Sequence, residues 1–145
     1  MMHWLEKHVI PVAGRIGAQR HLVAIRDGFV SVIPLIIIGS FAILLNNFPL
    51  PSIEGYQGFM MGIFGENFTM FGGNIWDASY AILALLVTMS ISYHLARSYG
   101  VDGLAAAILS VSTFVMLSPF TEDWGLSLAW TGSQGLFVAL FNAII

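Results

Sequence analysis

Three long apolar stretches separated by short polar connections run along this chain. They cover residues 28 to about 45, 78 to about 96 and 103 to about 118, and the first has no charged side chain. Eighteen residues of α-helix are about 27 Å long, close to the thickness of the hydrocarbon core of a bilayer. The pattern predicts three membrane-spanning helices. Residues 135–145 begin a fourth that reaches only about 17 Å, so we expect an incomplete last helix in a fragment of a longer protein.

The N-terminal residues show a different, amphipathic pattern. Apolar side chains recur three, four or seven residues apart and therefore share one face of an α-helix; they are Leu5, Val9, Val12, Ile16 and Val23. We expect residues 1–25 to form an interfacial amphipathic helix in the headgroup region, kinked near Pro11. A cytoplasmic helix packed on its own protein is the alternative.

The connections between the spans predict where helices begin and end. Residues 46–76 are expected to form a long connection, in which the apolar piece 56–65 is too short to span and is interfacial or re-entrant. Gly100 is predicted to end the second span. Asp77 and Asp102 precede the second and third spans and are expected to cap them.

Small residues line one face of the second and third spans. Ala84, Thr88 and Ser92 stand four residues apart, and Gly103 and Ala107 repeat this spacing. Small residues at this spacing let membrane helices approach closely. We expect the two spans to pack as an antiparallel hairpin along these faces.

Composition supports a membrane protein. The chain is 57% hydrophobic and 9% charged, whereas soluble domains carry roughly 25% charged residues. It has no basic block that would hold a nucleic acid, so we expect no nucleic-acid partner. It contains no cysteine, which excludes disulfides within it.

Charge placement predicts the orientation. In the three-span topology all basic residues fall on one side: Lys7, Arg15, Arg20, Arg26 and Arg97. The opposite side holds acidic residues only: Glu54, Glu66, Glu122 and Asp123, with Asp77 at its edge. Cytoplasmic loops are enriched in Lys and Arg. We therefore expect a cytoplasmic N-terminus, with Arg20, Arg26 and Arg97 as topology anchors.

Few residues carry recognisable chemistry. The histidines lack metal-ligand spacing, so we expect no metal, no cofactor and no catalytic residue. His94 and Arg97 lie three residues apart near the inner end of the second span and are weak candidates for substrate binding. The alternative is that Arg97 reaches the lipid headgroups. Asn142 is expected to hydrogen-bond between helices rather than to bind substrate.

Three segments carry a family resemblance: LEKHVIPVAGRIGAQRHLVAIRDGFVSVIPLIIIGS (5–40), NNFPLP (46–51) and SYGVDGLAAAILS (98–110). They resemble the N-terminus of the membrane-embedded IIC permease of the bacterial phosphoenolpyruvate-dependent sugar phosphotransferase system, in its lactose/cellobiose/diacetylchitobiose branch. The chain would correspond to about the first third of such a permease, with residues 26–145 in its N-terminal transmembrane half.

The resemblance implies an all-α, multi-pass protein of the bacterial cytoplasmic membrane. It implies a homodimer whose N-terminal half is the scaffold and whose absent C-terminal half binds the sugar, such as cellobiose, diacetylchitobiose or lactose. Phosphoryl transfer would be carried out by cytoplasmic IIB and IIA partners, so the chain would not itself be an enzyme. Two alternatives remain: a small membrane scaffold or non-transporting remnant that only mediates helix–helix association, and, less favoured, an intramembrane enzyme.

Overall fold

The computed structural model describes residues 14, 17–47, 54–65, 67–119, 125 and 127–145. The regular secondary structure of these residues is entirely helical, as the sequence predicts. Most of the expected interfacial helix lies outside the described residues, as do Lys7, Arg15, Glu66, Glu122 and Asp123.

Helix α2 (Arg20–Asn46) is the longest element. Its 27 residues give a length of about 40 Å, and the helix contains Pro34 without ending there. It is the one helix in the described part of the chain that is long and apolar enough to cross a membrane by itself. It begins at Arg20 rather than at Gly28, so residues 20–25 continue directly into the first predicted span.

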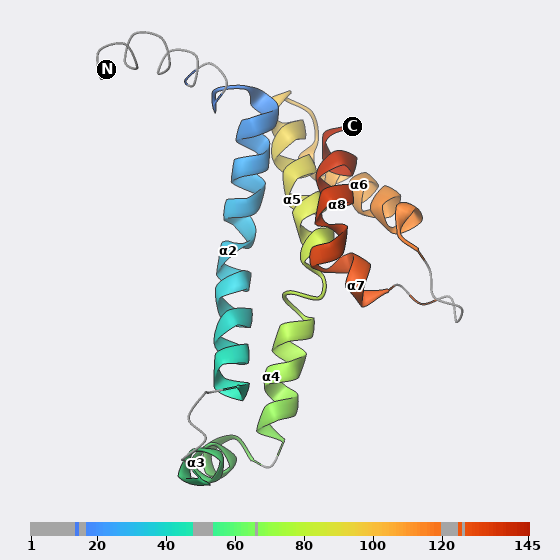
Figure 1. Cartoon of the computed structure of the whole chain (residues 1–145). Helices are drawn as coiled ribbons and strands as arrows, with labels where there is room; N and C mark the ends of the chain where they lie inside the picture. Colours follow the sequence, from blue (N-terminus) through green and yellow to red (C-terminus); the bar gives the residue numbers. More distant parts are fainter. Residues whose placement is uncertain (1–13, 15–16, 48–53, 66, 120–124, 126) are drawn as a thin grey trace, which may run out of the picture.

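The predicted connection after α2 contains two helices. Helix α3 (Glu54–Phe64) covers most of the short apolar piece and ends at Gly65, which has a φ of 83°. Helix α4 (Phe68–Asp77) then runs back alongside the far part of α2 (Figure 1). Its sequence has adjacent glycines and only ten residues, so no helical periodicity identified it.

The second predicted span begins later than expected. Residues 78–82 form turns, and helix α5 (Leu83–Ser98) follows them. Asp77 is the last residue of α4 and does not cap α5, whose N-cap residue is Ile82. Helices α4 and α5, interrupted by this break, together run antiparallel to α2 (Figure 1).

The predicted turn between the second and third spans is confirmed. Gly100 has a φ of 76°, and the Val101 and Gly100 amides donate to the carbonyls of Ala96 and Arg97, both at 3.1 Å. This is the Schellman pattern that ends a helix at a left-handed glycine. The Asp102 carboxylate then accepts from the Leu104 amide at 2.9 Å and caps helix α6 (Gly103–Leu117).

The C-terminal residues return along the hairpin. Helix α7 (Leu128–Thr131) and the 3₁₀-helix η1 (Ser133–Gly135) lead into helix α8 (Leu136–Ile144). Helix α5 lies at the centre and packs against α2, α6 and α8 (Figure 1). Its Ala84, Val87 and Ile91 are fully buried, so α5 supplies the core on which the other helices pack.

Helix α2 approaches its neighbours through glycines. A Cβ at Gly28 would collide with Ile91 of α5, and a Cβ at Gly39 would collide with Ser79 in the break. Eleven residues are about three helical turns, so these glycines share one face. The buried residues of α2 define this face: Ala24, Gly28, Val32, Gly39 and Ala42. The sequence analysis did not identify it.

Candidate functional site

A polar cluster joins helices α5, α6 and α8. The Asn142 amide nitrogen donates to the Ser110 carbonyl at 2.7 Å and to the Thr88 hydroxyl at 3.0 Å. The Thr88 and Ser110 hydroxyls lie 3.0 Å apart and are buried. Buried polar groups need such partners because they have no access to water. Asn142 thus makes the interhelical hydrogen bonds that the sequence led us to expect.

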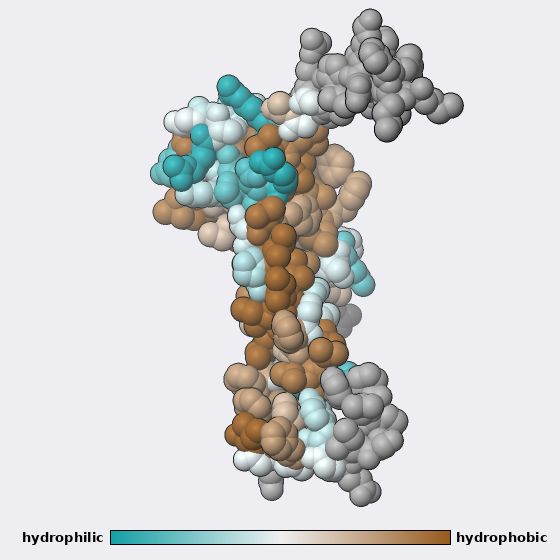
Figure 2. Space-filling model, turned by 90° about the vertical axis from the view of Figure 1, so that its left-hand side faces the viewer, coloured by the Kyte–Doolittle hydropathy of each residue, from teal (hydrophilic) through white to brown (hydrophobic). Residues whose placement is uncertain are grey.

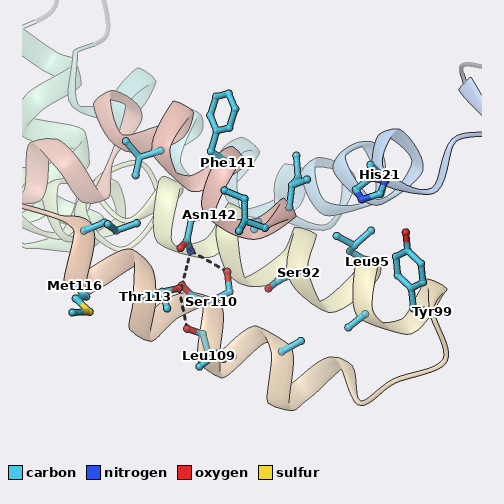
Figure 3. A pocket seen from close by; sticks show the side chains of 17 residues that line it. His21, Ser92, Leu95, Tyr99, Leu109, Ser110, Thr113, Met116, Phe141 and Asn142 are labelled. Atoms are coloured by element: carbon cyan, nitrogen blue, oxygen red, sulfur yellow. Dashed lines mark hydrogen bonds between the residues drawn. The ribbon is translucent and has the colours of Figure 1, made fainter.

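A groove of about 780 Å³ opens beside this cluster, between α5, α6 and α8. Asn142 and Ser110 lie within it, Met116 lies toward one end, and His21 and Tyr99 lie at the other (Figure 3). Its walls are mostly apolar. The groove therefore connects mid-depth of the helix bundle with the end where α2 begins and α5 ends.

Cationic and aromatic side chains meet at that end of the groove. The Arg20 guanidinium carbon lies 5.0 Å from the centre of the Tyr99 ring, within the range of a cation–π contact. His21 contacts the same ring edge-on, with the ring centres 6.2 Å apart. The hydrophilic surface of the described residues gathers at this end of the molecule (Figure 2).

The structure does not bring His94 and Arg97 into one site. His94 Nε2 lies 3.0 Å from the Ser31 hydroxyl of α2, and that hydroxyl donates to the Asp27 carbonyl at 2.8 Å. Arg97 instead donates to the Tyr93 hydroxyl at 3.1 Å and is exposed.

The other residues predicted to act as topology anchors also lie at this end. Arg26 forms an ion pair with Asp27 at 2.8 Å, and the side chains are 67% and 36% exposed. Such an exposed pair contributes little to stability. All three described basic residues, Arg20, Arg26 and Arg97, therefore belong to the start of α2 or the end of α5.

The five residues expected in helix packing, Ala84, Thr88, Ser92, Gly103 and Ala107, are all buried between the helices of this chain. A Cβ at Gly103 would lie 2.8 Å from the Tyr93 ring of α5. In the structure these small faces are covered by the chain's own helices.

Sequence reasoning missed the contacts around the break at residues 78–82. The Tyr80 hydroxyl lies 2.7 Å from that of Ser40, and its ring stacks on Trp76 with centres 4.3 Å apart. The Thr131 hydroxyl donates to the Ala81 carbonyl at 2.7 Å. The aromatic residues are visible in the sequence, but the hydrogen-bond partners Ser40 and Thr131 come from distant helices. Within the described ranges, no cluster of three or more metal-ligating side chains occurs.

Comparison with known proteins gives a consistent result. Residues 26–145 match the family model "Phosphotransferase system, EIIC". The chain is 39% identical to the lichenan permease IIC component of Bacillus subtilis (strain 168), covering 97% of this chain and 33% of that protein. It is 38% identical to the cellobiose-specific EIIC component of Geobacillus stearothermophilus, with 97% and 34% covered.

A solved structure agrees with these relatives. The crystal structure of ChbC, the IIC component of the N,N′-diacetylchitobiose-specific phosphotransferase system, superimposes with a TM-score of 0.84 at 41% identity. The match covers 97% of this chain and 35% of ChbC. The chain spans about a third of the length of the relatives it matches. With its helical architecture and its match from residue 26 to residue 145, the chain belongs to the EIIC family of the phosphotransferase system.

Proposed function

We propose that this chain is the N-terminal scaffold portion of a IIC permease that moves a sugar across the bacterial cytoplasmic membrane. The observation that carries the proposal is the family match over residues 26–145, which includes every helix from α3 to α8 and most of α2. The long apolar helix α2 and the largely apolar exposed surface support a membrane location. Phosphoryl transfer is assigned to the cytoplasmic IIB and IIA components, which are the proposed partners.

The substrate we propose is a β-linked disaccharide such as cellobiose, diacetylchitobiose or lactose. Relatives of this chain carry lichenan, cellobiose, lactose and diacetylchitobiose in their names. The test is uptake of each labelled disaccharide by cells that lack their own IIC component and express the reading frame containing this chain. Uptake that requires the IIB partner is expected. No uptake of any of the three sugars would count against the proposal.

We place the N-terminus in the cytoplasm. Arg20 and Arg26 stand at the start of α2, and Arg97 stands at the end of the antiparallel α5, so one end of this helix pair carries the described basic charge. A cysteine introduced at Glu54 should react with a membrane-impermeant reagent from outside intact cells. Replacing Arg20 and Arg26 by glutamine should lower this labelling, since fewer chains insert with this orientation. Unchanged labelling would argue against their steering role. The interfacial helix expected over residues 1–25 remains a proposal for residues 1–19 only, because residues 20–25 belong to α2.

We also propose a homodimer in which α2 contributes to the contact. One face of α2 presents the exposed apolar side chains Val30, Ile33, Ile37 and Phe41. An Ile37→Cys variant should form a disulfide between copies in membranes, whereas Ile108→Cys, on an exposed position of α6, should not. Equal cross-linking of both variants would indicate random collision.

The alternative is a small scaffold that only mediates helix–helix association, and its surface would then be the small-residue faces that include Ala84 and Thr88. Both side chains are fully buried by the chain's own helices. These two side chains therefore offer no free face to a partner helix, which favours the permease hypothesis over the scaffold hypothesis.

A further inference from the structure

The groove between α5, α6 and α8 offers an apolar surface although several polar residues line it. The Ser92 hydroxyl donates to the Thr88 carbonyl at 2.8 Å, and the Thr113 hydroxyl donates to the Leu109 carbonyl at 3.1 Å. The Asn142 nitrogen donates to Ser110 and Thr88. These donors are used within the chain, so a polar ligand such as a sugar would find few free hydrogen bonds there, whereas a hydrocarbon chain would lose none.

One end of the groove differs from the rest. Tyr99 and His21 line it, and the Arg20 guanidinium lies over the Tyr99 ring at 5.0 Å. A planar guanidinium pairs well with a phosphate group. Arg97 lies on another side of α5, against Tyr93, and Arg26 is paired with Asp27. None of the three described arginines is itself a lining residue of the groove, but Arg20 contacts the ring of Tyr99, which is one.

We propose that this groove binds an anionic glycerophospholipid, with one acyl chain between α6 and α8 and the phosphate beside Arg20. An anionic lipid is favoured because its phosphate complements the charge of Arg20. A hydrocarbon chain is favoured in the groove because the polar groups there already make hydrogen bonds within the chain. Basic pockets between membrane helices on the cytoplasmic side are known to hold anionic lipid headgroups. The proposal depends on the membrane location argued above, but not on sugar transport, so uptake and lipid binding can fail separately.

The test is native mass spectrometry of the purified chain in detergent, titrated with phosphatidylglycerol or phosphatidylcholine of identical acyl chains. Phosphatidylglycerol should bind more tightly than phosphatidylcholine, because only the former carries a net negative charge. The Arg20→Gln variant should weaken its binding about fivefold, as expected for one basic residue near a lipid surface. The matched Arg26→Gln variant removes the same charge at the same end of α2 and should bind as the unaltered chain does. Equal binding of the two lipids, or equal effects of the two substitutions, would overturn the headgroup assignment.

A second pair of variants tests the groove itself. Ala106 lines the groove, whereas Ile108 is exposed on the same helix outside it. Ala106→Phe should weaken the binding of both lipids, and Ile108→Phe should not, with circular dichroism confirming that both variants are folded. Undiminished binding by a folded Ala106→Phe chain would show that lipid binds elsewhere. The unaltered chain could instead form a dimer without bound lipid, and Ala106→Phe could abolish that dimer. This result would show that a second copy occupies the groove, and it would also refute the proposal.

Discussion

Replacing Asn142 by leucine tests the assembly of the last helix on the hairpin. The substitution keeps the side-chain size and removes both donors of the amide group. One donor is bonded to the Ser110 carbonyl at 2.7 Å, and the other is shared by the Thr88 and Ser110 hydroxyls at 3.0 and 3.2 Å. A hydrogen bond between membrane helices contributes about 0.6 kcal/mol on average. Losing two such bonds should lower the free energy of unfolding by about 1.2 kcal/mol, which is a seven- to eightfold shift in the unfolding equilibrium.

The assay is reversible unfolding of the chain in mixed micelles by titration with sodium dodecyl sulfate, followed by circular dichroism. Asn74→Leu is the matched control, because Asn74 is exposed on α4 and its side chain makes no hydrogen bond in the described part of the chain. A double-mutant cycle with Thr88→Val should give a coupling energy of about 0.6 kcal/mol between positions 88 and 142.

Two results would refute this reasoning. Asn142→Leu could be as stable as the Asn74→Leu control, in which case the bonds contribute nothing. The effects of Asn142→Leu and Thr88→Val could also add without a coupling energy, in which case the Thr88 hydroxyl is not a partner of the amide.

Two further pairs of substitutions test the fold. Gly72→Ala should lower the free energy of unfolding by about 1 kcal/mol, because its Cβ would displace the side-chain amide of Asn46, which donates to the Thr69 carbonyl at 2.9 Å. Gly73→Ala has nothing within 4 Å and should raise it by up to about 1 kcal/mol through helix propensity. The same detergent titration measures both, and equal effects would contradict the close packing of α4 on α2. Asp102→Ala should lower the free energy of unfolding by about 1 kcal/mol, because it removes the N-cap of α6. Asp77→Ala should leave it almost unchanged, since Asp77 caps no helix. A larger loss for Asp77→Ala than for Asp102→Ala would contradict this account of the break between α4 and α5.

The helices that follow from uninterrupted apolar runs were predictable. The run from residue 28 onward identified the first span because nothing polar interrupts it. Gly100 and Asp102 identified the turn between α5 and α6 because helix ends use local chemistry: a left-handed glycine and a capping carboxylate. Such signals depend only on near neighbours in the chain.

The break between α4 and α5 was not predictable in the same way. Its Tyr80 hydroxyl lies beside that of Ser40 on α2, and its Ala81 carbonyl accepts from Thr131 on α7. These partners are far away in sequence, so no local pattern reveals that a helix stops and restarts there. Asp77 was taken for a cap because a carboxylate before an apolar run has the same local pattern whether or not the helix begins there.

The sequence by itself determined the class of the protein: its apolar runs require a membrane or a comparable apolar surrounding, its motifs indicate a IIC permease, and its basic residues cluster at the proposed inner side. Only the tertiary structure decided that glycines of α2 meet α5, which groups of α5 and α6 Asn142 bonds, and that a groove ends at His21 and Tyr99 beside Arg20. The reason is physical. Hydropathy and capping are properties of a segment, whereas hydrogen-bond partners and cavities depend on how separate segments are placed around one another.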